Sequence, residues 1–129
     1  MNPVKEEFVQ GDFVSSREWK EVKKLSEIFF RLLSDPKIID RIDEVNHPGI
    51  SSHLIQDVIT EESEKLGFKS ERNGLFSNYK NSKLRPDFYK KIFDTGIIIE
   101  VEKGQTTQNN NDLKDFWKCH ICDEVNYLF

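Results

Sequence analysis

This 129-residue sequence has few cysteines, and it contains neither a long apolar run nor a stretch typical of a secretory leader. It has two cysteines, fewer than a secreted domain of this size often carries to hold its fold together. No apolar run approaches the ~20 residues of a membrane-spanning helix. The first residues, MNPVKEEFVQGDF, are acidic and contain no apolar stretch of the secretory type. We therefore expect a soluble, cytoplasmic protein with no membrane partner.

The composition that is present favours one folded domain. Aromatic residues make up 12% of the chain and include ten phenylalanines, which argues against a disordered protein. A chain of 129 residues is long enough for one hydrophobic core and little more. No internal repeat or low-complexity tract divides it, so we expect residues 1–129 to form a single domain.

Charge is distributed unevenly along the chain. Residues 67–91 hold seven Lys and Arg against two acidic residues, a local net charge of +5, whereas the whole chain has a formal net charge of −4. A basic block in an acidic protein is typical of a surface that binds polyanions such as nucleic acid. Lysines at a strand edge that discourage aggregation are the alternative.

Local signals predict three helices in the first half of the chain. The motif SSRE at 15–18 has the form of a capping box, and apolar residues at helical spacing follow it to about residue 34. Asp35-Pro36 combines an N-cap residue with Pro at the first position of a short second helix. Ser51 or Ser52 caps the third helix, and Gly67 is placed just after its end.

Glu62 lies on the inward face of the third predicted helix. It stands four residues after Val58 and four before Leu66, on the apolar stripe. A carboxylate on an inward face costs free energy unless a partner pairs with it. Glu62 is therefore either a stripe-edge residue whose carboxylate reaches solvent or a member of a site.

After Gly67 the hydrophobic period changes to that of strands. Asn73-Gly74 is typical of a type I′ turn between two strands, and Asp94-Thr95-Gly96 is predicted as the next turn. We expect extended segments over 68–79 (a hairpin), 84–93, 97–103 and 126–129, with a polar loop over 104–110 and a helix after it. The element order is α-α-α-β-β-β-α-β, which indicates an α/β (α+β) fold.

Two carboxylates stand one residue apart in the predicted strand 97–103. Alternate residues of a strand share a face, so Glu100 and Glu102 point one way while Val101 and Lys103 point the other. The predicted turn brings the preceding strand alongside and places Asp87 near Glu100. Carboxylates gathered on one patch repel unless a cation or raised pKa values relieve them, and Mg²⁺ prefers oxygen ligands of this kind. A solvent-facing acidic patch near a strand end is the alternative.

Arg85-Pro86-Asp87, followed by Ile97-Ile98-Ile99-Glu100-Val101-Glu102, resembles the core motif of the PD-(D/E)xK nuclease superfamily. The lysine of that motif is replaced, because Glu102 stands two residues after Glu100 and Lys103 comes one place later. This pattern resembles the BamHI-like branch of type II restriction endonucleases, in which Glu takes the place of the lysine. The resemblance covers about residues 52–129. It implies a restriction-endonuclease-like core over 51–129, with a central mixed β-sheet flanked by helices, after an N-terminal helical part over 1–50.

The resemblance also implies a mechanism and the residues that perform it. Asp87 and Glu100 would bind Mg²⁺, for which Mn²⁺ can substitute, and the carbonyl of Val101 would complete the metal shell. Glu102 would position or deprotonate the attacking water, and Glu62 matches a helix Glu that some members add to the site. The implied activity is that of a metal-dependent DNA endonuclease, of a restriction or defence kind, in which metal-activated water hydrolyses a phosphodiester bond.

The polar loop after this strand is a candidate for DNA contact. Gln and Asn side chains can hydrogen-bond adenine edges, and the amides at a helix N-terminus attract phosphates. The alternative is an ordinary strand-to-helix connection with an Asn cap. The candidate nucleic-acid-binding residues are Lys83, Arg85, Lys103, Gln105, Thr106, Thr107, Asn109, Asn110, Lys114 and Lys118.

Other possible ligands have weaker support. Cys119-His120-Ile121-Cys122 contains one C-x-x-C, whereas a zinc site needs about four ligands, so both cysteines are predicted as packing residues. His47 and His53 have no partner that the sequence identifies.

Three functions remain open at this point. The first is the DNA endonuclease, the second is a non-catalytic nucleic-acid-binding or structural module on the same fold, and the third is a repair or junction nuclease. One small domain has little room to cut both strands, which favours a homodimer with Trp19 and Phe29 or Phe30 at its interface. The chain stops at the start of its last predicted strand, so we expect a C-terminally truncated core, with more of the sheet beyond Phe129.

Overall fold

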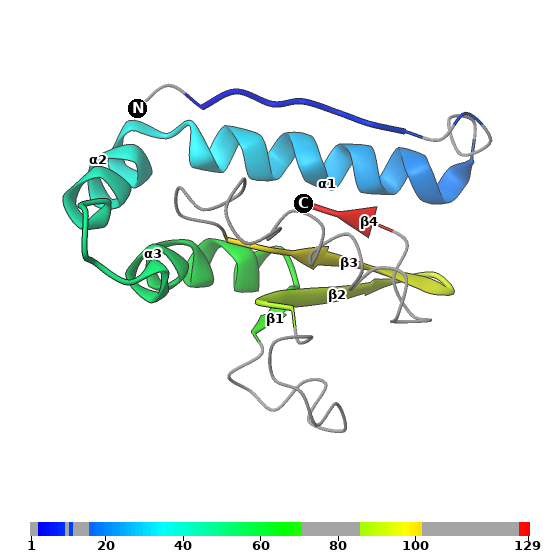
Figure 1. Cartoon of the computed structure of the whole chain (residues 1–129). Helices are drawn as coiled ribbons and strands as arrows, with labels where there is room; N and C mark the ends of the chain where they lie inside the picture. The colour runs from blue at the N-terminus through cyan, green and yellow to red at the C-terminus, as the bar shows by residue number, and fades with distance from the viewer. Residues whose placement is uncertain (1–2, 10, 12–15, 71–85, 102–126) are drawn as a thin grey trace.

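The fold is described from a computed structural model of the chain, which describes residues 3–9, 11, 16–70, 86–101 and 127–129. Within these residues three helices precede a mixed four-stranded sheet. No helix in the described ranges is long and apolar enough to cross a membrane. The elements in chain order are α1 (Arg17–Leu33), α2 (Pro36–Val45), α3 (Ser52–Lys65), β1 (Lys69–Ser70), β2 (Phe88–Ile92), β3 (Thr95–Ile99) and β4 (Tyr127–Leu128) (Figure 1).

The sheet has the strand order β1-β2-β3-β4. β1 with β2 and β2 with β3 pair antiparallel, whereas β3 with β4 pairs parallel. The predicted mixed sheet and the strand at the end of the chain are therefore confirmed. The predicted turn at Asn73-Gly74 and the helix after residue 110 lie outside the described residues.

The turn between β2 and β3 differs from the prediction. Thr95 pairs with Ile92 and Gly96 pairs with Lys91, so both belong to β3, and the two turn residues are Phe93 and Asp94. The prediction of a turn at Asp94-Thr95-Gly96 was therefore wrong. Phe93 adopts a positive φ of 50°, so the chain reverses before Gly96 is reached.

Helix starts follow local capping chemistry. Ser16 accepts a hydrogen bond from the amide of Trp19 at 3.0 Å, Asp35 caps α2, and Ser51 caps α3. The capping-box reading of SSRE was wrong in one respect. With Ser16 as the N-cap, the residue three places later is Trp19, so Glu18 is free of the reciprocal bond and accepts one from Tyr127 instead.

One hydrophobic core joins the described helices to one face of the sheet. Phe88, Ile92, Ile97 and Ile99 share that face by the strand register. The helical side chains buried with them are Val22, Leu25, Phe29, Ile38, Ile42, Val58 and Ile59. Ile98 points to the opposite face and is only 1% exposed, so β3 is buried on both sides.

The C-terminal strand is docked on α1 by aromatic packing and one short hydrogen bond. Trp19 stacks on Tyr127 and Phe29 stacks on Phe129, each pair with ring centroids 6.4 Å apart. The Tyr127 hydroxyl donates to Glu18 Oε1 at 2.6 Å. Trp19 and Phe29, predicted as dimer contacts, therefore pack within the chain.

The end of α3 is closed by a glycine in the left-handed conformation. Gly67 has φ of +88°, its amide donates to the Glu64 carbonyl at 2.9 Å, and the Phe68 amide donates to the Ser63 carbonyl at 3.0 Å. These two bonds form a Schellman motif, as the position of Gly67 in the sequence predicted. The motif turns the chain from α3 directly into β1 and buries Phe68.

We expect Gly67→Ala to lower the free energy of unfolding by about 1–2 kcal/mol, because an L side chain is strained at this φ. An added methyl group would also contact Lys90 Nζ, but that flexible end can move aside. Urea unfolding measures the change. Gly11→Ala is the control, since its added methyl meets no described atom within 4 Å; equal stability of Gly67→Ala and wild type would contradict the prediction.

The pair Tyr127 and Glu18 predicts a pH dependence. Burial, and then the bond to the Glu18 carboxylate, raise the pKa of Tyr127 above its ordinary value of about 10. The folded protein therefore keeps the phenolic proton where the unfolded chain loses it, so this stabilisation is present below about pH 10 and is lost as the pH rises.

We expect Tyr127→Phe to cost about 1–2 kcal/mol at neutral pH and to lose less stability than wild type between about pH 9 and pH 11. Urea unfolding at several pH values measures both effects. In a Glu18→Gln background the cost of Tyr127→Phe should shrink, and an unchanged cost there would show that the bond contributes nothing.

Candidate active site

Asp87 and Glu100 lie at the open end of the β2–β3 hairpin, away from its turn. Phe88 pairs with Ile99, so the same register brings Asp87 opposite Glu100, one step beyond the last paired residues. Directly opposed residues in an antiparallel pair have Cβ atoms about 5 Å apart. β3 ends at Ile99, so Glu100 follows the buried strand and is not part of it.

Asp87 is held at both carboxylate oxygens. The Val101 amide donates to Oδ2 at 2.8 Å, and the Gln56 side-chain amide donates to Oδ1 at 3.0 Å. Hydrogen bonds to an ionised carboxylate are among the stronger ones in proteins. They fix the direction of the carboxylate at the place where the two strand ends meet α3.

Glu100 is half-buried, and its Oε1 is hidden from solvent. Its backbone amide donates to the Phe129 carbonyl at 3.1 Å, and the Phe129 amide donates to the Ile98 carbonyl at 2.8 Å. The chain around β4 thus fixes the backbone of Glu100. A site at this point is bounded by β2, β3, β4 and α3 together.

Gln56 is the site residue that the sequence analysis missed. It lies 31 positions before Asp87, on α3, and its other side-chain atom, Oε1, is 3.3 Å from His53 Nδ1. A signal was present in the sequence: Gln56, Thr60 and Ser63 are uncharged polar residues at i, i+4 and i+7, on one face of the helix beside the apolar stripe. Ser63 is fully buried, so this face of α3 does point inward.

Glu62, the helix carboxylate that the sequence singled out, lies elsewhere on α3. Lys65 Nζ donates to Glu62 Oε1 at 3.1 Å, and this bond, followed by the one that Lys65 donates to Glu61, raises the pKa of Lys65. Gln56 stands six residues earlier, about 9 Å along the helix axis. Among the residues that the structure describes, no three His, Cys, Asp or Glu side chains gather to hold a metal ion, so Glu62 does not join Asp87 and Glu100 in one cluster.

The donors present at the hairpin end suit a hard divalent cation. Mg²⁺ is usually held by one or two carboxylates together with water and substrate phosphates. Asp87 and Glu100 supply two carboxylates at this end of the hairpin, and carboxylate oxygens are ligands of the kind that Mg²⁺ takes. The residues present therefore fit such an ion.

Most of the other predicted site residues lie outside the described residues. Val101, predicted to offer its carbonyl, is described and donates its amide to Asp87. The remaining candidates fall within 71–85 and 102–126, and these are Lys83, Arg85, Glu102, Lys103, Gln105, Thr106, Thr107, Asn109, Asn110, Lys114 and Lys118.

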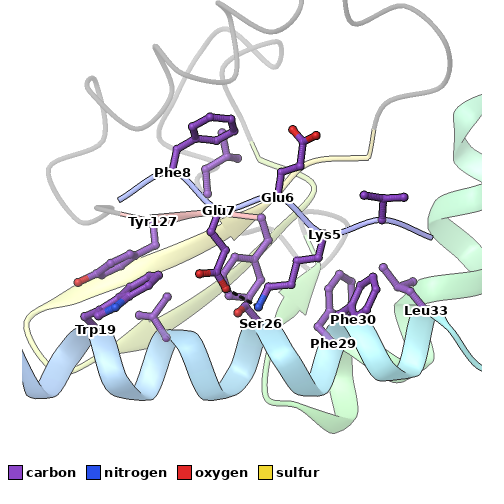
Figure 2. Close-up of a pocket in the computed structure, with 14 residues that line it drawn as sticks. Lys5, Glu6, Glu7, Phe8, Trp19, Ser26, Phe29, Phe30, Leu33 and Tyr127 are labelled. Carbon is purple, nitrogen blue, oxygen red and sulfur yellow. Dashed lines mark ion pairs between the residues drawn. The ribbon is translucent and has the colours of Figure 1, made fainter. Parts of the chain in front are cut away.

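A separate cavity of about 720 Å³ lies between the N-terminal segment, α1 and β4 (Figure 2). Its wall is mostly apolar and includes Trp19, Phe29 and Phe30. Lys5 and Glu7, which both line the cavity, form an ion pair at 2.5 Å, and the hydrogen bond from Lys5 holds the pKa of Glu7 below its usual range. Asp87, Glu100 and Gln56 are not among its lining residues, so the cavity is not part of the carboxylate site.

Comparisons of the chain with family models, with curated proteins and with solved structures find no match.

Proposed function

We propose that this chain is a metal-dependent DNA endonuclease of the PD-(D/E)xK kind. The observation that carries the proposal is the meeting of Asp87 and Glu100 at one end of a hairpin whose register is set by a buried strand. Their sequence context, Pro-Asp and then an apolar strand ending in Glu-Val-Glu, is the motif described above. Two independent features, spacing in the sequence and proximity in the fold, support the same site.

In this proposal Asp87 and Glu100 hold Mg²⁺ or Mn²⁺, and the Val101 carbonyl adds a neutral oxygen. Held there, such an ion would supply a coordinated water of lowered pKa and would offset charge on the phosphate. Glu102, two residues after Glu100 in the motif, positions the attacking water and accepts its proton. Val101 and Gln56 direct the Asp87 carboxylate, because both donate a hydrogen bond to it.

The basic block supports a polyanionic substrate. The Lys and Arg residues of 67–91, with Lys103, Lys114 and Lys118, attract the phosphate backbone of DNA. The side-chain amides of Gln and Asn in the loop 105–110 contact base edges. Affinity for DNA should therefore fall steeply with salt concentration. Restriction or defence is the proposed setting, and a homodimer is the proposed form for cutting both strands.

We expect wild-type protein to cleave plasmid DNA with Mg²⁺ or Mn²⁺, and Asp87→Asn and Glu100→Gln to cut at least about 100-fold more slowly, since even indirect partners of metal ligands cost 10–100-fold. Glu102→Ala should also lose activity. Gel analysis of nicked and linear products measures the rates.

Glu61→Gln is the matched control, because Glu61 is an exposed carboxylate of α3 that pairs only with Lys65 among the described contacts. It should retain wild-type cleavage. Cleavage undiminished in both Glu100→Gln and Glu102→Ala would overturn the assignment. Cleavage confined to branched or nicked substrates would point to a repair or junction nuclease.

We also expect divalent cations to raise thermal stability by mass action. At a metal concentration about 100 times Kd the gain is about 2.7 kcal/mol, and thermal melts with Mg²⁺, Mn²⁺ or Ca²⁺ measure it. The double variant Asp87→Asn/Glu100→Gln should show no gain. No shift in the wild type would favour a non-catalytic nucleic-acid-binding or structural module.

A further inference from the structure

Three polar side chains form a row that leads from the start of α3 to the candidate site. His53 Nδ1 is 3.3 Å from Gln56 Oε1, and Gln56 Nε2 is 3.0 Å from Asp87 Oδ1. The row continues to the strand end, where Asp87 Oδ2 accepts the Val101 amide at 2.8 Å. Of these four residues, Asp87 and Val101 belong to the sequence motif. His53 and Gln56 lie outside it and are brought to the site by the fold.

The chemistry of the row fixes the direction of every hydrogen bond in it. An ionised carboxylate only accepts, so the NH₂ end of Gln56 must face Asp87. The carbonyl end then faces His53, and because this oxygen also only accepts, His53 must carry its hydrogen on Nδ1. A reversed amide would set its oxygen against the carboxylate oxygen, and two acceptors would then face each other.

The helix that carries Gln56 is anchored, so the amide is a firm support. Val58 and Ile59 are 6% and 5% exposed and belong to the core. The Schellman motif at Gly67 ties the far end of α3 to β1, which pairs with β2. Asp87 immediately precedes β2, so the bond from Gln56 ties it to a helix that is itself fixed to the sheet.

We propose that Gln56 is the positioning residue for Asp87, and that His53 holds the Gln56 amide in the orientation this requires. The inference rests on the proposed metal site, and it adds two residues that the motif does not contain. With both oxygens directed, Asp87 meets a divalent cation without first losing rotamer freedom. Gln56 acts on the ion only through Asp87.

The experiment compares the affinity of the full-length chain for Mn²⁺, measured by the EPR signal of free Mn²⁺, in wild type, Gln56→Leu and Thr60→Val. Partners that orient a metal ligand cost about 10–100-fold in affinity when removed, and we expect that loss for Gln56→Leu. Thr60→Val is the matched control: its hydroxyl bonds the Gln56 backbone carbonyl at 2.6 Å on the same face of α3, and its removal leaves the Asp87 contacts in place. We expect its affinity to stay within about twofold of wild type, well inside the loss that a removed partner causes.

His53→Ala tests the role of His53 itself. This side chain is exposed, so we expect its removal to leave the fold intact. We expect a smaller loss of Mn²⁺ affinity than for Gln56→Leu. The double variant His53→Ala/Gln56→Leu should bind no more weakly than Gln56→Leu alone, because His53 acts through Gln56. A purely structural effect of either residue would instead add in the double variant.

A second measurement needs no metal. In metal-free protein the NMR couplings of the Asp87 β-protons should report one χ1 rotamer in wild type and Thr60→Val, and averaging in Gln56→Leu. Wild-type Mn²⁺ affinity in Gln56→Leu, or a fixed Asp87 rotamer in that variant, would overturn the positioning role. No Mn²⁺ binding by the wild type would overturn the proposed metal site instead, and the rotamer data would still decide whether Gln56 positions Asp87.

Discussion

Phe88 lies opposite Ile99, and Ile92 lies opposite Thr95, in the antiparallel pairing of β2 with β3. The rest of the structure depends on this register. A slip of one residue would turn Ile97 and Ile99 away from the helices and put Ile98 in their place. It would also move Asp87 off its position opposite Glu100. The burial of β3 on both faces therefore determines, through the register, where the two carboxylates meet.

A few specific contacts determine how the helices pack against this hairpin. The Schellman motif at Gly67 sends the chain from α3 into β1, which pairs with β2, and so sets α3 beside the start of β2. That placement carries Gln56 to Asp87. On the other side of β3, the pairing with β4 and the Tyr127–Glu18 bond connect α1 to the backbone of Glu100. The candidate site thus lies where separate packing constraints converge on two strand ends.

The same arrangement explains why two carboxylates can be kept close together. A strand interior would bury their charge without relief. Just beyond the strand, Asp87 has the Val101 and Gln56 donors, and Glu100 is half-buried rather than enclosed. The Asp87 carboxylate is held in place by a backbone amide and a side-chain amide.

Much of the backbone follows from the sequence by itself. The caps Asp35 and Ser51 and the helix end at Gly67 could be predicted, because each depends on chemistry within a few residues, whereas α1 is capped by Ser16 and not by a capping box that ends at Glu18. The nearness of Asp87 to Glu100 could be inferred from a hairpin between two strand patterns. The turn lies at Phe93-Asp94 and not at Asp94-Thr95-Gly96, since Phe93 adopts a positive φ, which is more usual for glycine.

The support of the site was decided by the tertiary structure alone. Gln56 was passed over in favour of Glu62, because a charged residue on an inward face gives a stronger signal than an amide. Which helix residue reaches Asp87, 31 positions away, depends on how α3 is turned and seated on the sheet. The role of Glu18 as the partner of Tyr127, 109 positions away, depends likewise on the docking of β4 against α1. Local chemistry thus determined the elements, and only long-range packing decided which polar side chains meet.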